Sequence, residues 1–354
     1  MRFSAFVSPT LQTAGHPIRF YHSLLPGRAP VFAMPAISAA DTICSPAAFM
    51  QPTSRRSFLG RVIATSIMTL AANPDSNAAA APPQHRFLAV DDGTHTLVHV
   101  DEKDPARNWS VATGYVMDLQ LIGQNRVLIS VDDGFREYDL TSGNLLKSVR
   151  GAGGKCYSVH RSDDGVTVLT GDDLGGQKGA SLVIYDRTDT IVERKVFASA
   201  TMLRHLRPTL TGTYLMTAVG QVVEVDSGWN IIQQWKVAGN LFKAIRLANG
   251  NILLSSGPGA RYLKELHPQG EVVREIRGDQ LAEGSFSGFH LQPNGNVVVA
   301  NWLGHGPDHD GTVLVEYDRN GKIVWRYGRL HASFVEVIVL DGMTGQALPT
   351  SSEQ

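Results

Sequence analysis

The chain has 354 residues and a formal net charge of −1. That length suits one large repeat domain or two ordinary ones, and the near-neutral charge excludes the basic field of a protein that binds nucleic acid or an anionic membrane. Only two cysteines occur, Cys44 and Cys156, and because Cys44 falls in the presequence described next, no intramolecular disulfide is expected in the mature chain.

The first predicted element is an export signal. The run Ser54-Arg55-Arg56-Ser57-Phe58-Leu59 resembles the twin-arginine pattern S-R-R-x-F-L. Residues 62–72 follow as a weakly apolar core that is too short for a permanent membrane span, and small residues at 77–81 suit a signal peptidase. Pro82-Pro83 stops a helix from continuing. We therefore expect a twin-arginine signal peptide over residues 50–83, a periplasmic mature protein and no stable membrane span.

Residues 1–49 are expected to be an upstream segment that is either disordered or not translated. Twin-arginine signals lie near a true N-terminus, and Met50 stands four residues before Ser54, so one interpretation is that translation starts at Met50. The segment carries a single acidic residue, Asp41, and no strand periodicity, which suits either alternative.

From Phe87 onward a pattern of four short strands recurs. Its clearest copy is Ser287–Gly328, where Asn294-Gly295 and Asp318–Gly321 mark turns between apolar runs. A sheet of this kind has two apolar faces and needs neighbours of its own kind to bury them. The outermost strand of each copy ends near Val111, Val149, Val196, Val237, Ile276 and Tyr327.

These ends are 38 to 51 residues apart, close to the span of a four-stranded propeller blade. The first copy lacks its innermost strand, and Phe334–Leu340 is a strand with no repeat behind it, so we expect this C-terminal strand to complete blade one and close the ring. No long amphipathic helix pattern follows residue 83, which disfavours a doubly wound fold. The prediction is an all-β, six-bladed β-propeller over residues 84–341, with seven blades as the alternative and a flexible tail over residues 342–354.

Two sets of loops are predicted to share one rim of the propeller around its central channel. These are the loops between second and third strands and the loops between blades, so residues far apart in the sequence converge there. The longest and most polar of them is Asn301–Asp310. Six histidines map to this rim or to innermost strands: His160, His205, His290, His305, His309 and His331.

A divalent metal site is one hypothesis for the rim. Imidazoles that converge on a channel suit copper or zinc, and one loop alone contains four possible ligands. Pairs of aspartates after three second strands would suit calcium if their carboxylates converged, although Asp-Asp-Gly is also ordinary turn chemistry. Hydrogen-bonded surface histidines are the alternative. The candidate metal ligands are His305, His309, Asp308 and Asp310.

A catalytic pair of histidines is a second hypothesis. His290 and His160 each stand five residues before a turn glycine, and a channel-facing histidine can act as nucleophile or general base. Cations beside them would hold an anionic group, while an amide and an indole would add a donor and a stacking face. A polar channel filled with water is the alternative. The predicted ligand-binding residues are Asn301, Trp302, Lys243 and Arg204.

The repeat text resembles known propeller families. NGN before an apolar run, followed by VEYDRNGKIVWRYG at Val315–Gly328, is similar to the quinoprotein-like and arylsulfotransferase-like repeats, over roughly Phe87–Leu340. In arylsulfotransferases of this type, a channel histidine transfers sulfate between phenols, and the resemblance makes His290 the corresponding residue. The Ser-Arg-His run of that family at the end of a second strand is replaced here by TVLTGDD and NVVVANW.

The leading hypothesis is a periplasmic propeller that binds a small polar or anionic ligand, or a partner protein, at a rim rich in histidine and aspartate. Nucleic acid is not an expected partner. The alternative is an enzyme, either an arylsulfotransferase-like transferase or a metal-assisted hydrolase that uses His290, His305 and His309. The expected cofactor, if one is used, is copper, zinc or calcium.

Overall fold

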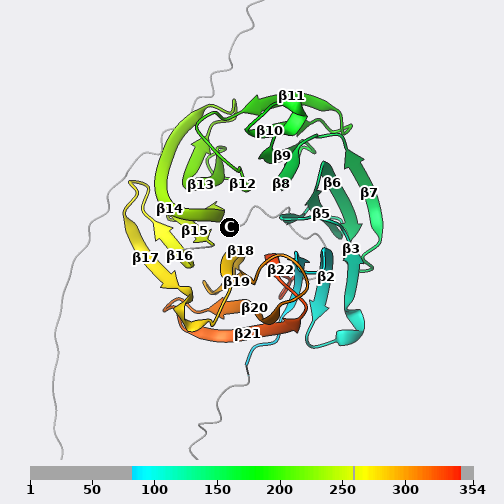
Figure 1. The fold of residues 1–354 in the computed structure, drawn as a ribbon, viewed down its shortest axis with the longest axis vertical. Coiled ribbons are helices and arrows are strands. Elements are labelled where there is room, and N and C mark those ends of the chain that lie inside the picture. The colour runs from blue at the N-terminus through cyan, green and yellow to red at the C-terminus, as the bar shows by residue number, and fades with distance from the viewer. Residues whose placement is uncertain (1–81, 258–259, 344–354) are drawn as a thin grey trace, which may run out of the picture. The chain divides into compact units, whose positions relative to one another are not determined.

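The computed structural model describes residues 82–257 and 260–343. These residues form 22 β-strands and three short 3-10 helices, η1 (Pro105–Arg107), η2 (Leu174–Gly176) and η3 (Gly278–Gln280). Figure 1 shows the sheets standing around a common centre, which confirms the prediction of an all-β propeller. None of the described helices is long and apolar enough to cross a membrane. The predicted upstream segment, the signal peptide up to residue 81 and the tail from residue 344 lie outside the described residues.

Four sheets contain four antiparallel strands each. In chain order, the first has β1 (Arg86–Asp91), β2 (Thr96–Asp101), β3 (Trp109–Ala112) and β22 (Phe334–Val339). The second has β4 (Leu119–Leu121), β5 (Arg126–Val131), β6 (Gly134–Asp139) and β7 (Leu145–Arg150). The third has β8 (Lys155–Arg161), β9 (Thr167–Asp172), β10 (Ala180–Tyr185) and β11 (Ile191–Val196). The last has β18 (Ser285–Leu291), β19 (Val297–Trp302), β20 (Asp310–Tyr317) and β21 (Ile323–Leu330).

A fifth sheet has six strands because two of its strands are unusually long. Its order is β12-β13-β14-β15-β16-β17, and β13 and β14 contain 12 and 16 residues. The pairing of β13 with β14 shifts register between Val219 and Gln221, on either side of Gly220. Gly220 has a φ of 70°, a backbone conformation that glycine adopts without steric strain. The bounds are β12 (His205–Pro208), β13 (Tyr214–Val225), β14 (Ile231–Arg246), β15 (Ile252–Ser256), β16 (Tyr262–Leu266) and β17 (Val272–Arg277).

The C-terminal strand closes the ring as expected. β22 pairs antiparallel with β1, with Phe87 opposite Val339 and Ala89 opposite Val337. The first sheet therefore takes three strands from the start of the described chain and its innermost strand from the end. Closure removes the free sheet edge that would otherwise be open to pairing with another chain.

Burial falls from the inside of each sheet to the outside. β5 (RVLISV) is buried at every position but the first, whereas β7 (LLKSVR), the outermost strand of the same sheet, has no buried residue. Inner and middle strands are covered on both faces by adjacent sheets, so their sequences are apolar runs without strict alternation. The described residues form six hydrophobic clusters, and one of them, which contains Phe87, Val98, Val313 and Phe334, joins the last sheet to the first.

Candidate functional site

A pocket of about 270 Å³ lies where the innermost strands begin, and we call it the mouth pocket. Its lining comes from all five sheets or from the loops that join them, so it lies at the centre of the ring. This is the convergence of loops that the repeat pattern predicts. The charged and aromatic residues of its lining are Asp92, Tyr115, Lys155, Arg204, Phe242, Trp302 and His305.

Arg204 is the more buried of the two cations that line this pocket. Its guanidinium lies over the ring of Phe242, 4.5 Å from the centroid, and its Nε is buried without a hydrogen-bond partner. No carboxylate of the described residues lies within ion-pair distance of it. Burial lowers the pKa of Arg204, yet a guanidinium keeps its proton in proteins. The pocket therefore presents a positive charge that has no ion-pair partner among the described residues, and one of its nitrogens, Nη2, lies 3.9 Å from Met202 Sδ.

A second cation, Lys155, stands beside it at the start of β8. Its Nζ lies 4.3 Å from the ring centroid of Tyr115 and 5.6 Å from that of Tyr157. Burial raises the pKa of Tyr115 to about 12, and burial together with the charge of Asp172 raises the pKa of Tyr157 further. Both phenols thus stay neutral near pH 7 and offer aromatic faces rather than counter-charges.

The one carboxylate in the lining, Asp92, is already engaged on one oxygen. Its Oδ2 accepts hydrogen bonds from Trp302 Nε1 at 2.9 Å and from His305 Nδ1 at 2.7 Å, while Oδ1 is buried without a partner. The rings of Trp302 and His305 meet edge to face with centroids 4.9 Å apart. This arrangement fixes the indole at the pocket wall and leaves an acceptor for a ligand hydroxyl or amide.

Four buried ionisable residues each come directly after a lining residue in the chain, and we call them the buried layer. Four lining residues, Met117, Arg204, Phe242 and Val335, are each followed by a residue that is at most 2% exposed. Consecutive Cα atoms are about 3.8 Å apart, so this layer lies directly beside the pocket. Its members are Asp118, His205, Lys243 and Glu336.

Ion pairs satisfy the charges in this layer. Arg207 binds Asp118 with two hydrogen bonds, Nη2 to Oδ1 at 2.6 Å and Nη1 to Oδ2 at 3.0 Å. Ser158 donates to the same carboxylate at 2.5 Å, and Lys243 Nζ lies 3.3 Å from Glu336 Oε1. His205 differs from them, since neither ring nitrogen has a hydrogen-bond partner.

Burial and the neighbouring cations keep the imidazole of His205 neutral. Burial lowers the pKa of His205 well below its ordinary value, and the positive charges of Arg207 and Lys243 lower it further. A neutral imidazole has one donor and one acceptor nitrogen. Both are therefore available, in a fully buried place, to whatever ligand can reach them.

The structure brings together only some of the predicted ligand-binding residues. Arg204 and Trp302 line the mouth pocket, whereas Lys243 follows the lining residue Phe242 in the chain and pairs with Glu336. Asn301 is buried within its sheet, where its amide donates to the backbone oxygens of Glu283 and Thr312. It therefore ties β19 to β20 and to the segment before β18, and it is not part of the pocket lining.

The predicted metal loop does not converge on one point. His305 bonds to Asp92, the ring of His309 lies 3.2 Å from the backbone oxygen of His305, and Asp310 accepts from the backbone of His331. Asp308 is exposed. Among the described residues, three groups able to bind a metal together occur elsewhere, at Asp118, His205 and Glu336.

The predicted catalytic histidines lie toward the opposite ends of their strands from the mouth pocket. His290 pairs with Val298 near the end of β18, and its Nδ1 accepts a hydrogen bond from the backbone of Val339. His160 packs against Tyr214 with ring centroids 6.3 Å apart, and burial, followed by the charge of Arg207, lowers its pKa to about 3. Each ring serves the packing of neighbouring sheets in this structure.

A larger cavity of about 640 Å³ lies at the outside of the ring, between the first and second sheets. Its cations already have partners: Arg86 donates to the backbone oxygens of Leu340 and Met343, and Arg107 pairs with Asp104 at 3.3 Å. Because its charges are satisfied, this cavity offers less to an ionic ligand than the mouth pocket does.

Sequence reasoning did not select several residues of the site. Asp118, Tyr115 and Lys155 stand in short segments before or at the start of innermost strands, without a motif of their own. Glu336 did carry a signal, since it is the one charged residue in the apolar run FVEVIVL. A charge in the middle of a buried strand requires a partner, and the structure shows it to be Lys243.

Comparisons with known proteins identify the fold and no family. No family model matches the chain, and no curated protein matches it either. A protein of unknown function from Bacteroides caccae is 15% identical with a TM-score of 0.59, covering 73% of this chain and 99% of the other. A chain of a nidogen/laminin complex is 11% identical with a TM-score of 0.52, covering 75% and 100%. A streptogramin B lyase is 10% identical with a TM-score of 0.48, covering 69% and 82%.

Proposed function

We propose that the propeller binds a small anionic ligand with an aromatic or apolar portion in the mouth pocket. The observation that carries this proposal is Arg204, a largely buried guanidinium whose Nε has no hydrogen-bond partner and which forms no ion pair with a carboxylate of the described residues. A buried charge without a partner is costly, and binding proteins keep such groups where a ligand supplies the opposite charge.

The other residues of the pocket suit the same class of ligand. Lys155 adds a second positive charge, while Phe242 and Trp302 provide apolar faces on which a ring can pack. Asp92 Oδ1 remains as an acceptor for a polar group of the ligand. The pocket volume is at the small end for ligand sites, which favours a small molecule over a peptide or polymer.

Calorimetry with a matched pair of ligands tests this proposal. We expect benzoate to bind the wild-type protein more tightly than benzamide, which has the same shape without the charge. Hydrogen bonds to charged groups contribute about 1.5–3 kcal/mol, so Arg204→Met should weaken benzoate binding by about tenfold or more. Arg187→Met, which removes an exposed arginine, is the control and should leave binding unchanged. Equal binding of benzoate by wild type and Arg204→Met would refute the assignment.

We also propose that the six-stranded sheet represents two blades, giving six in all. One support is the register shift at Gly220, which separates the second-strand and third-strand parts of β13. Another is the hydrophobic cluster that includes Leu215, Trp235, Leu254 and Tyr262, because it packs the two halves of this sheet against each other as neighbouring blades pack. An experimental structure that showed one flat six-stranded sheet would contradict this count.

We further propose that the chain is exported by the twin-arginine route and acts in the periplasm. The support is the run Ser54–Leu59 with its apolar sequel. Replacing both Arg55 and Arg56 by lysine should retain the protein in the cytoplasm when cell fractions are probed by immunoblot. Unchanged periplasmic accumulation of that variant would exclude this route.

A further inference from the structure

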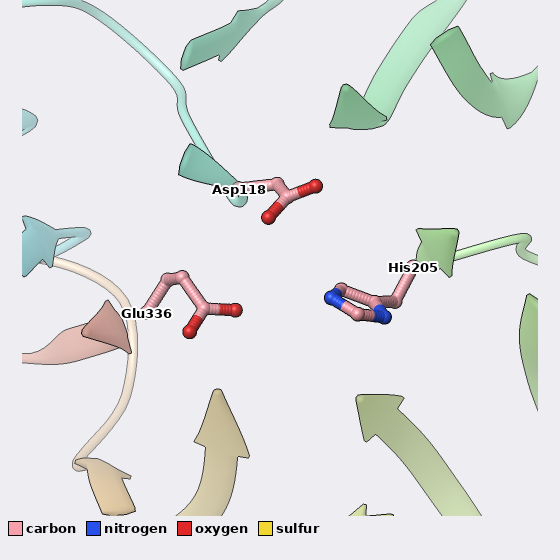
Figure 2. Close-up of side chains that lie close together, drawn as sticks. All are labelled: Asp118, His205 and Glu336. Atoms are coloured by element: carbon pink, nitrogen blue, oxygen red, sulfur yellow. The ribbon is translucent and has the colours of Figure 1, made fainter. Parts of the chain in front are cut away.

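Three metal-binding side chains from three different sheets meet beside the mouth pocket. Asp118 precedes β4, His205 begins β12 and Glu336 lies in β22, and Figure 2 shows all three turned toward a common point. One ligand atom from each lies within 4.8 Å of the others, and all three residues are at most 2% exposed. Residues 87 to 218 positions apart in the chain are thus held together by ring closure alone.

His205 gives an independent indication that a group binds there. Its ring is fully buried, yet neither Nδ1 nor Nε2 has a hydrogen-bond partner among the described residues. Leaving a buried polar group unsatisfied is costly, so such groups usually have a partner, either in the protein or bound to it. Figure 2 shows the ring aimed at the two carboxylates.

We propose that Asp118, His205 and Glu336 bind one Zn²⁺ ion beside the mouth pocket. One imidazole and two carboxylates form a mixed nitrogen and oxygen set that suits zinc, whereas Ca²⁺ prefers six to eight oxygen ligands. Three protein ligands also leave a coordination position for water or for a ligand, as in catalytic zinc sites.

Two cations, Arg207 and Lys243, already bind the two carboxylates that would hold the ion. Asp118 Oδ2 accepts from Ser158, Val159 and Arg207, whereas Oδ1 accepts one hydrogen bond, from Arg207 Nη2, and keeps a lone pair for a metal. The ion would therefore bind Oδ1, and the pair with Arg207 would remain as an outer contact that orients the carboxylate. Lys243 lies against Glu336 and competes with the ion for the same carboxylate. Zinc binding therefore requires the Lys243 ammonium to give up this contact, so removal of the ammonium should strengthen binding.

Titration of ZnCl₂ into chelator-treated full-length protein, followed by calorimetry, tests the site. We expect one ion per chain for the wild type, at least tenfold weaker binding for His205→Ala, and unchanged binding for His309→Ala on the rim. Absence of zinc binding by the wild type, or equal binding by His205→Ala, would overturn the proposal. Loss of binding in His309→Ala alone would place the ion in the rim loop and overturn it as well.

A second variant keeps the test decisive if His205→Ala does not fold. Lys243→Met removes the competing ammonium and the ion pair that it forms with Glu336, so this variant should be less stable without metal than the wild type. The expected result is a larger rise of the melting temperature on adding ZnCl₂ for Lys243→Met than for the wild type. A smaller or absent rise in Lys243→Met would show that the layer is a closed ion-pair network without a metal.

Discussion

Buried charged residues at the mouth-pocket end of the strands differ in their pairing from those at the opposite end. At the end away from the mouth pocket, each buried glutamate of a third strand finds cations or amides: Arg161 binds Glu137 at 2.6 Å, Arg246 binds Glu224, and His85, Gln292 and Asn296 bind Glu316. At the mouth, Arg204 has no ion-pair partner among the described residues, and neither ring nitrogen of His205 has a hydrogen-bond partner. Since His160 Nδ1 and Arg161 Nη2 at the far end also lack hydrogen bonds, the two ends differ in whether a buried charge faces an opposite charge.

The largest change in the free energy of unfolding is expected when a buried ion pair far from the mouth pocket is removed. Glu137 is almost fully buried and forms ion pairs with Arg161, Arg126 and Lys147. Burial alone would raise the pKa of Glu137, but these cations hold it below its usual range. Glu137→Ala removes the carboxylate that these cations share and leaves Arg161, whose side chain is 15% exposed, with Asp189 at 3.8 Å, so it should cost about 1.5–3 kcal/mol in the free energy of unfolding.

Urea denaturation measures this cost. Glu193→Ala, on the exposed outer strand β11, is the control and should change the free energy by less than about 0.5 kcal/mol. Equal values for the two variants would mean that the buried glutamates do not hold neighbouring sheets together.

Ring closure should depend on pH through His85. Burial lowers the pKa of this imidazole, but Glu316 at 2.9 Å and Asp341 at 2.5 Å outweigh burial and leave the pKa raised. A raised folded-state pKa contributes stability that is fully present below the unfolded value of about 6.5 and is lost as the pH rises through the folded value. The stability difference between wild type and His85→Gln should therefore shrink between pH 6 and pH 9 in urea titrations, and a constant difference would contradict this role.

At the mouth pocket, removal of a charged side chain should leave the free energy of unfolding unchanged or increase it. Arg204→Met removes a guanidinium that has no counter-ion and keeps the contact with Phe242, so the unfolding free energy should stay level or rise by up to about 1 kcal/mol. Differential scanning calorimetry without ligand checks this expectation. A loss of more than about 2 kcal/mol would show that Arg204 has a structural partner and would remove the contrast between the two ends.

The smallest effect is expected in the loop between β19 and β20. Asp308 is exposed, so Asp308→Ala should change stability by less than about 0.5 kcal/mol and leave benzoate and zinc binding unchanged. Loss of either ligand in this variant would return the functional site to the rim loop.

The sequence predicted the fold because each repeat carries its own turns and apolar runs. Asn294-Gly295 and Phe334–Leu340 were enough to predict a hairpin and the closing strand, and the pairing of β22 with β1 confirms the latter. The merging of strands in β13 was not foreseen, because VGQ reads as an ordinary turn in the sequence YLMTAVGQVVEV.

The site was harder to predict because it depends on which side of each inner strand faces the centre. His290 was selected by its distance from a turn glycine, and the same distance places it far from the mouth. Arg204 and Trp302 were selected because loops between second and third strands and loops between blades were expected to share one rim, and both residues line the mouth pocket. Asp118 and Glu336 needed the closed ring itself, since no spacing in the chain relates residues of different blades.

A crystal structure of the protein grown with benzoate would test the central claim most directly. The account predicts the carboxylate within hydrogen-bond distance of the Arg204 guanidinium and the ring against Phe242 or Trp302. Benzoate bound elsewhere, with only water beside Arg204, would contradict the claim that the unpaired charge at the mouth is the ligand site.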